Sequence, residues 1–158
     1  MNRLWAPWRS AYIKGGNNRE CIFCIKEKSR NDREELILKK GNNAFIVMNL
    51  YPYNPGHIMI VPYKHTGNIE EIDNDTFIEI KLFLDLSLKI LKEHMNVQGF
   101  NIGFNIGRIA GAGVEDHVHM HIVPRWNGDN NFMPVIGQTR VISMNIFELY
   151  DELYTYYK

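Results

Sequence analysis

Residues 117–123 read His117-Val118-His119-Met120-His121-Ile122-Val123, so imidazole and apolar side chains alternate strictly before two aliphatic residues. In a β-strand, side chains two residues apart point to the same face. We therefore expect the three histidines on one face of a strand and the apolar residues between them in the core. A single histidine is usually structural, but three on one polar face are typical of a metal site or a phosphoryl-transfer site.

The segments outside this run predict an antiparallel α+β domain with one main helix packed on a sheet. The segment 51–56 holds two prolines and a glycine and is expected to be a loop. Gly41-Asn42 is expected to be the turn of a hairpin. Four further strands are expected, at 35–40, 43–49, 57–61 and 100–105.

Two helices are expected. The longer one runs from about 75 to 95 and is capped by Asp73 or Asn74, and the shorter one runs from about 145 to 156. Apolar residues at helical spacing predict which side of the long helix faces the core: Phe77, Ile80, Phe83 or Leu84, Leu88 and Leu91.

The chain has 158 residues, which fits one domain spanning 1–158, with an N-terminal arm at 1–20 and a C-terminal extension at 127–158. Its 18 basic and 18 acidic side chains cancel, which argues against nucleic acid as the main partner. No segment is apolar enough for a membrane span, and the start lacks a signal-peptide core. The cytoplasm is the expected location.

Both cysteines lie in Cys21-Ile22-Phe23-Cys24, half of a tetrahedral metal site. Histidine usually completes such a site, and the candidates are His65 and His117. Four protein ligands would make the metal structural, because no coordination position stays open. The alternatives are two inert thiols or a thioredoxin-like redox pair. The redox pair would need to start a helix in a βαβ unit, which the pattern does not show.

The histidine run resembles the signature of the histidine-triad (HIT) superfamily, in which three histidines alternate with apolar residues. The similarity extends upstream through Asn49, the 55–62 segment around His57, and Asn105. The flanking segments 4–9 and 125–134 are similar to a bacterial and archaeal branch of diadenosine tetraphosphate phosphorylases or hydrolases.

This resemblance implies a reaction through a covalent nucleotidyl-histidine. His119 would attack the α-phosphorus of a nucleotide, with its other nitrogen held by the backbone carbonyl of His117. His121 and His57 would bind phosphate oxygens and stabilise charge in the transition state. The preferred substrate would be diadenosine tetraphosphate, and phosphorolysis is favoured over hydrolysis. Arg108 or Arg125 would meet a polyphosphate tail.

The resemblance also implies the residues that hold the nucleotide. Asn49 would contact ribose or phosphate and Asn105 the phosphate, while Gly111, Ala112 and Gly113 would bring backbone N–H groups close to it. Many relatives carry a Gln-Ser, Gln-Thr or Gly-Ser pair in this loop. Here Ala112-Gly113 supplies no hydroxyl, and one extra residue separates Asn105 from His117. The preference for water or phosphate depends on this loop.

Members with the cysteine pair bind zinc, so the resemblance implies a structural zinc held by Cys21, Cys24, His65 and His117. It also implies a homodimer. Three alternatives stay open: a nucleoside phosphoramidate hydrolase, a nucleotide sensor without turnover, and a hydrolase with a metal among all three histidines of the run.

Overall fold

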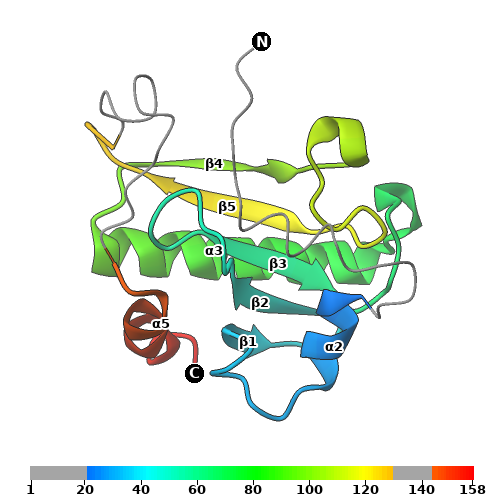
Figure 1. Ribbon diagram of the computed structural model, residues 1–158, viewed down its shortest axis with the longest axis horizontal. Helices are drawn as coiled ribbons and strands as arrows, with labels where there is room; N and C mark the ends of the chain where they lie inside the picture. The colour runs from blue at the N-terminus through cyan, green and yellow to red at the C-terminus, as the bar shows by residue number, and fades with distance from the viewer. Residues whose placement is uncertain (1–20, 130–143) are drawn as a thin grey trace.

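The computed structural model describes residues 21–129 and 144–158. Its centre is a five-stranded antiparallel sheet with the order β1-β2-β3-β5-β4, and one long helix runs along one face of this sheet (Figure 1). The predicted α+β architecture is confirmed. The strands are β1 (Ile37–Lys40), β2 (Ala44–Met48), β3 (Ile58–Pro62), β4 (Gly99–Phe104) and β5 (Met120–Arg125).

The helices are α2 (Ile22–Lys28), α3 (Asn74–Met95) and α5 (Ile146–Tyr154), with short 3₁₀ turns η1 (Ile69–Glu71) and η2 (Arg108–Ala110). Within the described ranges, none of these helices is long and apolar enough to cross a membrane. The arm at 1–20 lies outside the described residues, as do residues 130–134 of the segment 125–134.

The sheet is buried at its centre and open at one edge. Every residue of β2 and β3 is buried, because these continuous apolar strands lie between neighbours and under α3. β4 pairs only with β5, and the middle of β4 is exposed. The strand that carries His121 is therefore one position in from the open edge.

Helix α3 begins and ends where its sequence provides caps. The Asp73 carboxylate accepts a hydrogen bond from the Thr76 backbone N–H at 2.8 Å, and Asn96 ends the helix with a left-handed φ of 51°. The predicted buried side was wrong at Phe77, which is 36% exposed. Thr76 occupies the buried position of that turn instead, so the core face starts one residue earlier.

Two features near the site differ from the prediction. Cys21 caps helix α2, which the sequence pattern did not indicate, although the antiparallel sheet provides no βαβ unit for a redox pair. Strand β5 starts at Met120, so His117 and His119 precede it. The preceding segment is held by a hydrogen bond from Val118 N–H to the Thr66 carbonyl at 2.7 Å.

Close packing fixes this segment further. A side chain added at Gly67 would place its Cβ 2.6 Å from the backbone oxygen of Glu115, so only glycine allows the two loops to approach this closely. At the other end of the sheet, α5 packs beside β1, where the buried Tyr150 hydroxyl donates to the Ile37 carbonyl at 2.8 Å. The C-terminal tyrosine Tyr150 thus has a packing role.

Candidate active site

His119 is positioned as a neutral nucleophile. Its Nδ1 lies 2.8 Å from the His117 carbonyl oxygen, which can only accept, so Nδ1 carries the proton and Nε2 carries the lone pair. Burial lowers the pKa of His119, with the nearby His117 ring acting in the same direction, while the bond to the carbonyl acts against them. The ring is therefore neutral near pH 7, which an imidazole nucleophile requires.

His57 and His121 form a hydrogen-bonded pair beside His119. The Tyr53 backbone N–H donates to His57 Nδ1 at 3.1 Å, and Asn49 Nδ2 lies 3.3 Å from the same atom. A backbone N–H can only donate, so the His57 proton must be on Nε2. His57 Nε2 then donates to His121 Nδ1 at 2.9 Å.

This pair presents a donor to the substrate side. With Nδ1 of His121 accepting, the proton of its neutral ring is on Nε2. Burial is the main reason that the pKa falls to about 3 for His57 and to about 4 for His121, with the neighbouring histidines adding to both shifts. Both rings are thus neutral near pH 7, and His121 offers an N–H to an anion.

His57 itself has no nitrogen left for phosphate. Its side chain is fully buried, and both ring nitrogens already have partners. A direct contact between His57 and a phosphate oxygen would require His57 to exchange one of these partners. In the present arrangement the buried His57 ring contacts His121, which faces the pocket. We call the array from the Tyr53 N–H through His57 to His121 the histidine relay.

The four predicted metal ligands converge. One donor atom from each of Cys21, Cys24, His65 and His117 lies within 4.8 Å of the others. A tetrahedral zinc with bonds of about 2.0–2.3 Å has edges between its ligand atoms of about 3.3–3.8 Å. Four of the six separations between ligand atoms lie in this range. Cys21 Sγ is 3.3 Å and Cys24 Sγ is 3.8 Å from His117 Nδ1. His65 Nδ1 is 3.4 Å from Cys24 Sγ and 3.3 Å from His117 Nδ1.

The protonation pattern of this cluster also suits a cation. His117 Nε2 lies 2.8 Å from the Pro62 carbonyl and therefore carries the proton, which leaves its Nδ1 free to bind a metal. Burial alone would raise the pKa of the Cys21 thiol, but the interaction with the His117 side chain and hydrogen bonds from backbone N–H groups lower it to about 6. Burial and the nearby Cys21 raise the pKa of Cys24.

The metal cluster and the nucleophile share one residue and one aromatic ring. His117 supplies a ring nitrogen to the cluster and a backbone carbonyl to His119. Phe23, from the helix that carries the cysteines, packs on both imidazoles with ring centroids 5.3 Å from His117 and 4.9 Å from His119. Within the described residues, the metal-binding group does not include His119 or His121, which argues against a metal held by all three histidines.

Comparisons with known proteins agree with this geometry. A family model described as HIT domain matches residues 30–128. The chain belongs to the HIT family. A protein named AP-4-A phosphorylase from Mycobacterium tuberculosis is 35% identical over 150 residues, which cover 90% of this chain and 77% of the relative.

Solved structures of HIT proteins share the fold. A Zn-bound histidine triad family protein from Mycobacterium smegmatis superposes with a TM-score of 0.69 at 22% identity, covering 87% of this chain and 93% of that chain. A Plasmodium falciparum diadenosine triphosphate hydrolase gives a TM-score of 0.62 at 24% identity, covering 80% of this chain and 76% of its own. The predicted membership of the HIT superfamily is confirmed.

An open pocket of about 370 Å³ lies over β4 and β5 of this HIT fold. His121 and Asn105 both contribute to its wall, which brings two of the predicted site residues together. Tyr53 also lines it, with its ring centroid 4.8 Å from His57 and 6.2 Å from His121. Its backbone role was not predicted, because no sequence motif indicates which N–H reaches a given imidazole.

The glycine-rich loop is shaped by two glycines in the left-handed region, Gly107 at φ 79° and Gly111 at φ 91°. In this structure, the N–H groups of Gly111 and Ala112 donate to carbonyls of the same loop, at 3.0 and 3.3 Å. To bind phosphate as predicted, these two amides would have to exchange those partners. The role of Gly111, Ala112 and Gly113 stays a prediction.

Proposed function

We propose that this HIT protein cleaves dinucleoside polyphosphates, with diadenosine tetraphosphate as the preferred substrate and phosphate as the preferred acceptor. The observation that carries the proposal is the tautomer of His119, whose Nδ1–H is held by the His117 carbonyl so that Nε2 is left as the nucleophile. The name of the M. tuberculosis relative supports the substrate and the phosphorolytic outcome.

The reaction has two displacement steps at the α-phosphorus. In the first, the His119 Nε2 lone pair forms an N–P bond, and the bond from the α-phosphorus to the bridging oxygen breaks, releasing ATP when diadenosine tetraphosphate is the substrate. His121 donates its Nε2–H to a phosphate oxygen and stabilises the developing charge. His57 acts as a positioning residue for His121. In the second, an oxygen of inorganic phosphate attacks, the N–P bond breaks, and ADP leaves.

The remaining site residues have supporting roles in this proposal. Asn105, in the wall of the pocket beside His121, contacts the phosphate. Asn49 reaches the ribose or phosphate from its place next to His57. The loop residues Gly111, Ala112 and Gly113 turn their amides toward the phosphate when substrate binds.

Cys21, Cys24, His65 and His117 hold a structural zinc in this proposal. The metal supplies a fixed crosslink between the start of α2 and the segment ahead of β5. This crosslink orients the His117 carbonyl that accepts from His119. The reducing cytoplasm is the proposed location, since both cysteines would stay reduced there and could bind zinc. The protein acts as a homodimer, and the exposed edge strand β4 is available for the contact.

The first test incubates the protein with diadenosine tetraphosphate, with and without inorganic phosphate, and separates the nucleotides by chromatography. His119→Ala is the test variant. His94→Ala is the matched control, because His94 stacks on Tyr156 outside the site at 3.5 Å between centroids. We expect ADP and ATP only with phosphate, no turnover by His119→Ala, and full turnover by His94→Ala.

The other outcomes discriminate the alternatives. AMP and ATP without phosphate would make the protein a hydrolase. Turnover of adenosine phosphoramidate but not of the dinucleotide would replace the proposal with a phosphoramidase. Binding without any turnover would make the protein a sensor, and equal activity of His119→Ala would remove His119 as the nucleophile.

A further inference from the structure

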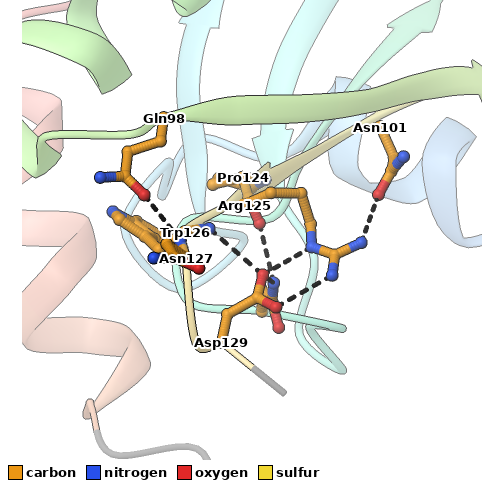
Figure 2. Close-up of polar contacts among 8 residues, drawn as sticks. Gln98, Asn101, Pro124, Arg125, Trp126, Asn127 and Asp129 are labelled. Carbon is orange, nitrogen blue, oxygen red and sulfur yellow. Dashed lines mark hydrogen bonds and ion pairs between the residues drawn. The ribbon is translucent and has the colours of Figure 1, made fainter.

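A polar cluster lies where strand β5 ends, next to the active site, with Asn54 buried and Arg125 and Asp129 partly exposed. Figure 2 shows the Asp129 carboxylate facing the Arg125 guanidinium and the Trp126 backbone. Asn54 completes the cluster from the 51–56 loop, donating from Nδ2 to Asp129 Oδ2 at 3.0 Å and to the Pro124 carbonyl at 2.8 Å.

Asn54 is held more firmly than a loop residue needs to be. Its side chain is only 4% exposed, and its amide reaches partners 70 and 75 positions further along the chain. The 51–56 loop contains Pro52 and Pro55, which have no backbone N–H to donate. Side-chain contacts therefore have to replace the backbone hydrogen bonds that would otherwise fix the path of this loop.

Asp129 is a strong partner for this contact. Its carboxylate accepts from Arg125 Nε and Nη2, Asn54 Nδ2 and the Trp126 backbone N–H. The Arg125 hydrogen bonds are the main reason that the pKa of Asp129 lies far below its usual range, so the group stays charged at any working pH. A charged acceptor forms stronger hydrogen bonds than a neutral one.

The 51–56 loop, which is held by the contact between Asn54 and Asp129, also sets which ring nitrogens carry the protons in the histidine relay. Asn54 directly follows Tyr53, whose N–H donates to His57 Nδ1 at 3.1 Å. The Asn54 carbonyl in turn accepts the backbone N–H of His57 at 3.1 Å. A shift of Asn54 therefore moves both backbone groups that frame His57.

The positions of the protons in the histidine relay decide whether His121 can donate a hydrogen bond to a phosphate oxygen. While Tyr53 N–H donates to His57 Nδ1, the His57 proton is on Nε2 and His121 keeps its own proton on Nε2, facing the substrate side. Without that donor, only the longer contact from Asn49 Nδ2 at 3.3 Å opposes a proton on His57 Nδ1. The His57 proton can then move to Nδ1, and His121 would donate from Nδ1 to His57. The bare Nε2 of His121 would repel a phosphate oxygen instead of binding it.

We propose that Asn54 and Asp129 are positioning residues that hold the 51–56 loop in place, so that the Tyr53 N–H stays on His57 and the histidine relay points toward the substrate. The effect on catalysis rests on the proposed function. The effect on the protonation of His57 and His121 does not rest on the proposed function, and the ¹⁵N chemical shifts of the ring nitrogens measure it separately.

The test compares three variants with a matched control. Asn54→Ala removes both donors, and Asn54→Asp places a carboxylate against Asp129. Asp129→Ala removes the acceptor at this contact and leaves the bond from Asn54 to the Pro124 carbonyl in place. The control is Gln98→Ala, because Gln98 Oε1 accepts from Asn127 N–H in the same turn at 2.6 Å but does not touch Asn54.

The main readout is the ¹⁵N chemical shift of the His57 and His121 ring nitrogens in the zinc-loaded full chain. We expect the wild type and Gln98→Ala to show a single tautomer with the proton on Nε2. Asn54→Ala, Asn54→Asp and Asp129→Ala should all show mixed tautomers. In turnover assays, kcat should fall by about tenfold or more with a smaller change in KM.

Thermal unfolding of each variant separates this role from plain stabilisation. If Asn54→Ala and Asn54→Asp keep the wild-type tautomers while unfolding earlier, Asn54 only holds the fold and the proposal is wrong. If the tautomers change as expected but no variant turns over dinucleotides, the proposed function fails while the positioning role stands. If Asp129→Ala keeps the wild-type tautomers while the two Asn54 variants lose them, the Asn54–Asp129 contact is not the cause.

Discussion

Lowering the pH from about 7 to about 5 should destabilise the fold through the buried pair His57 and His121. Burial lowers their pKa values to about 3 and about 4, whereas in the unfolded chain both would titrate near the ordinary value of 6.5. Between the two values the unfolded state binds more protons than the folded state. The stabilisation is therefore complete above about pH 6.5 and is lost as the pH falls toward the folded pKa values.

The size of this loss follows from the same values. Going from pH 7 to pH 5 costs about 2 kcal/mol for each histidine, because the unfolded ring becomes almost fully protonated while the folded ring stays neutral. The pair together costs about 4 kcal/mol, a large part of the roughly 5–15 kcal/mol that holds a typical domain.

Urea unfolding of the wild type and of His121→Gln at both pH values measures the effect. Glutamine accepts a hydrogen bond from His57 through its side-chain oxygen, so the variant removes one titrating ring without leaving His57 Nε2 unpaired. We expect the loss between the two pH values to be about 2 kcal/mol smaller in the variant than in the wild type. Acid also protonates the metal ligands, but it does so in both proteins and cancels in the difference. An equal loss in both proteins would refute the reasoning.

Three further predictions concern other parts of the fold. Asp73→Ala should lower the free energy of unfolding by about 1 kcal/mol, because Thr76 N–H loses its cap at the start of α3, and urea unfolding checks this. Gly67→Ala should lower both the unfolding temperature and kcat, because the added Cβ pushes on the Glu115 oxygen and displaces the segment that leads to His119. An unchanged kcat would show that the packing of this loop does not position His119. Cys24→Ser should cut zinc content, measured by metal analysis after dialysis, and should lower the unfolding temperature of the zinc-loaded protein by several degrees. Full zinc retention by that variant would show that Cys24 is not a ligand.

Much of the site was predictable because its signals are local. The alternation of residues 117–123 identified the three histidines, and the Cys-x-x-Cys spacing identified half of the metal cluster. His65 was predictable only through the family resemblance, since 41 positions separate it from Cys24. The family resemblance predicted the His117 carbonyl as the partner of His119, and the structure confirms this contact. The Tyr53 N–H and the Pro62 carbonyl were not predicted, because no side-chain pattern indicates which backbone group will lie beside a given imidazole.

Some errors had the same origin. Helical spacing alone placed Phe77 in the core, but the sheet below α3 accepts the neighbouring Thr76 instead. Alternation alone placed all three histidines on one strand. In the structure His117 and His119 precede β5, and the His117 ring lies beside Cys21, while the rings of His119 and His121 pack together with centroids 4.7 Å apart.

By itself, the sequence determined the family and the sheet with its long helix, because these depend on residue type and short spacing. Together with the family resemblance, it also predicted the nucleophile, the carbonyl that holds it and the four candidate metal ligands. Only the tertiary structure decided which nitrogen of His57, His117 and His121 carries the proton. That choice depends on the Pro62 carbonyl and the Tyr53 N–H, backbone groups whose direction is set by the fold. Protonation in turn separates the nucleophile His119 from the donor His121, although the two residues are of the same type on the same segment.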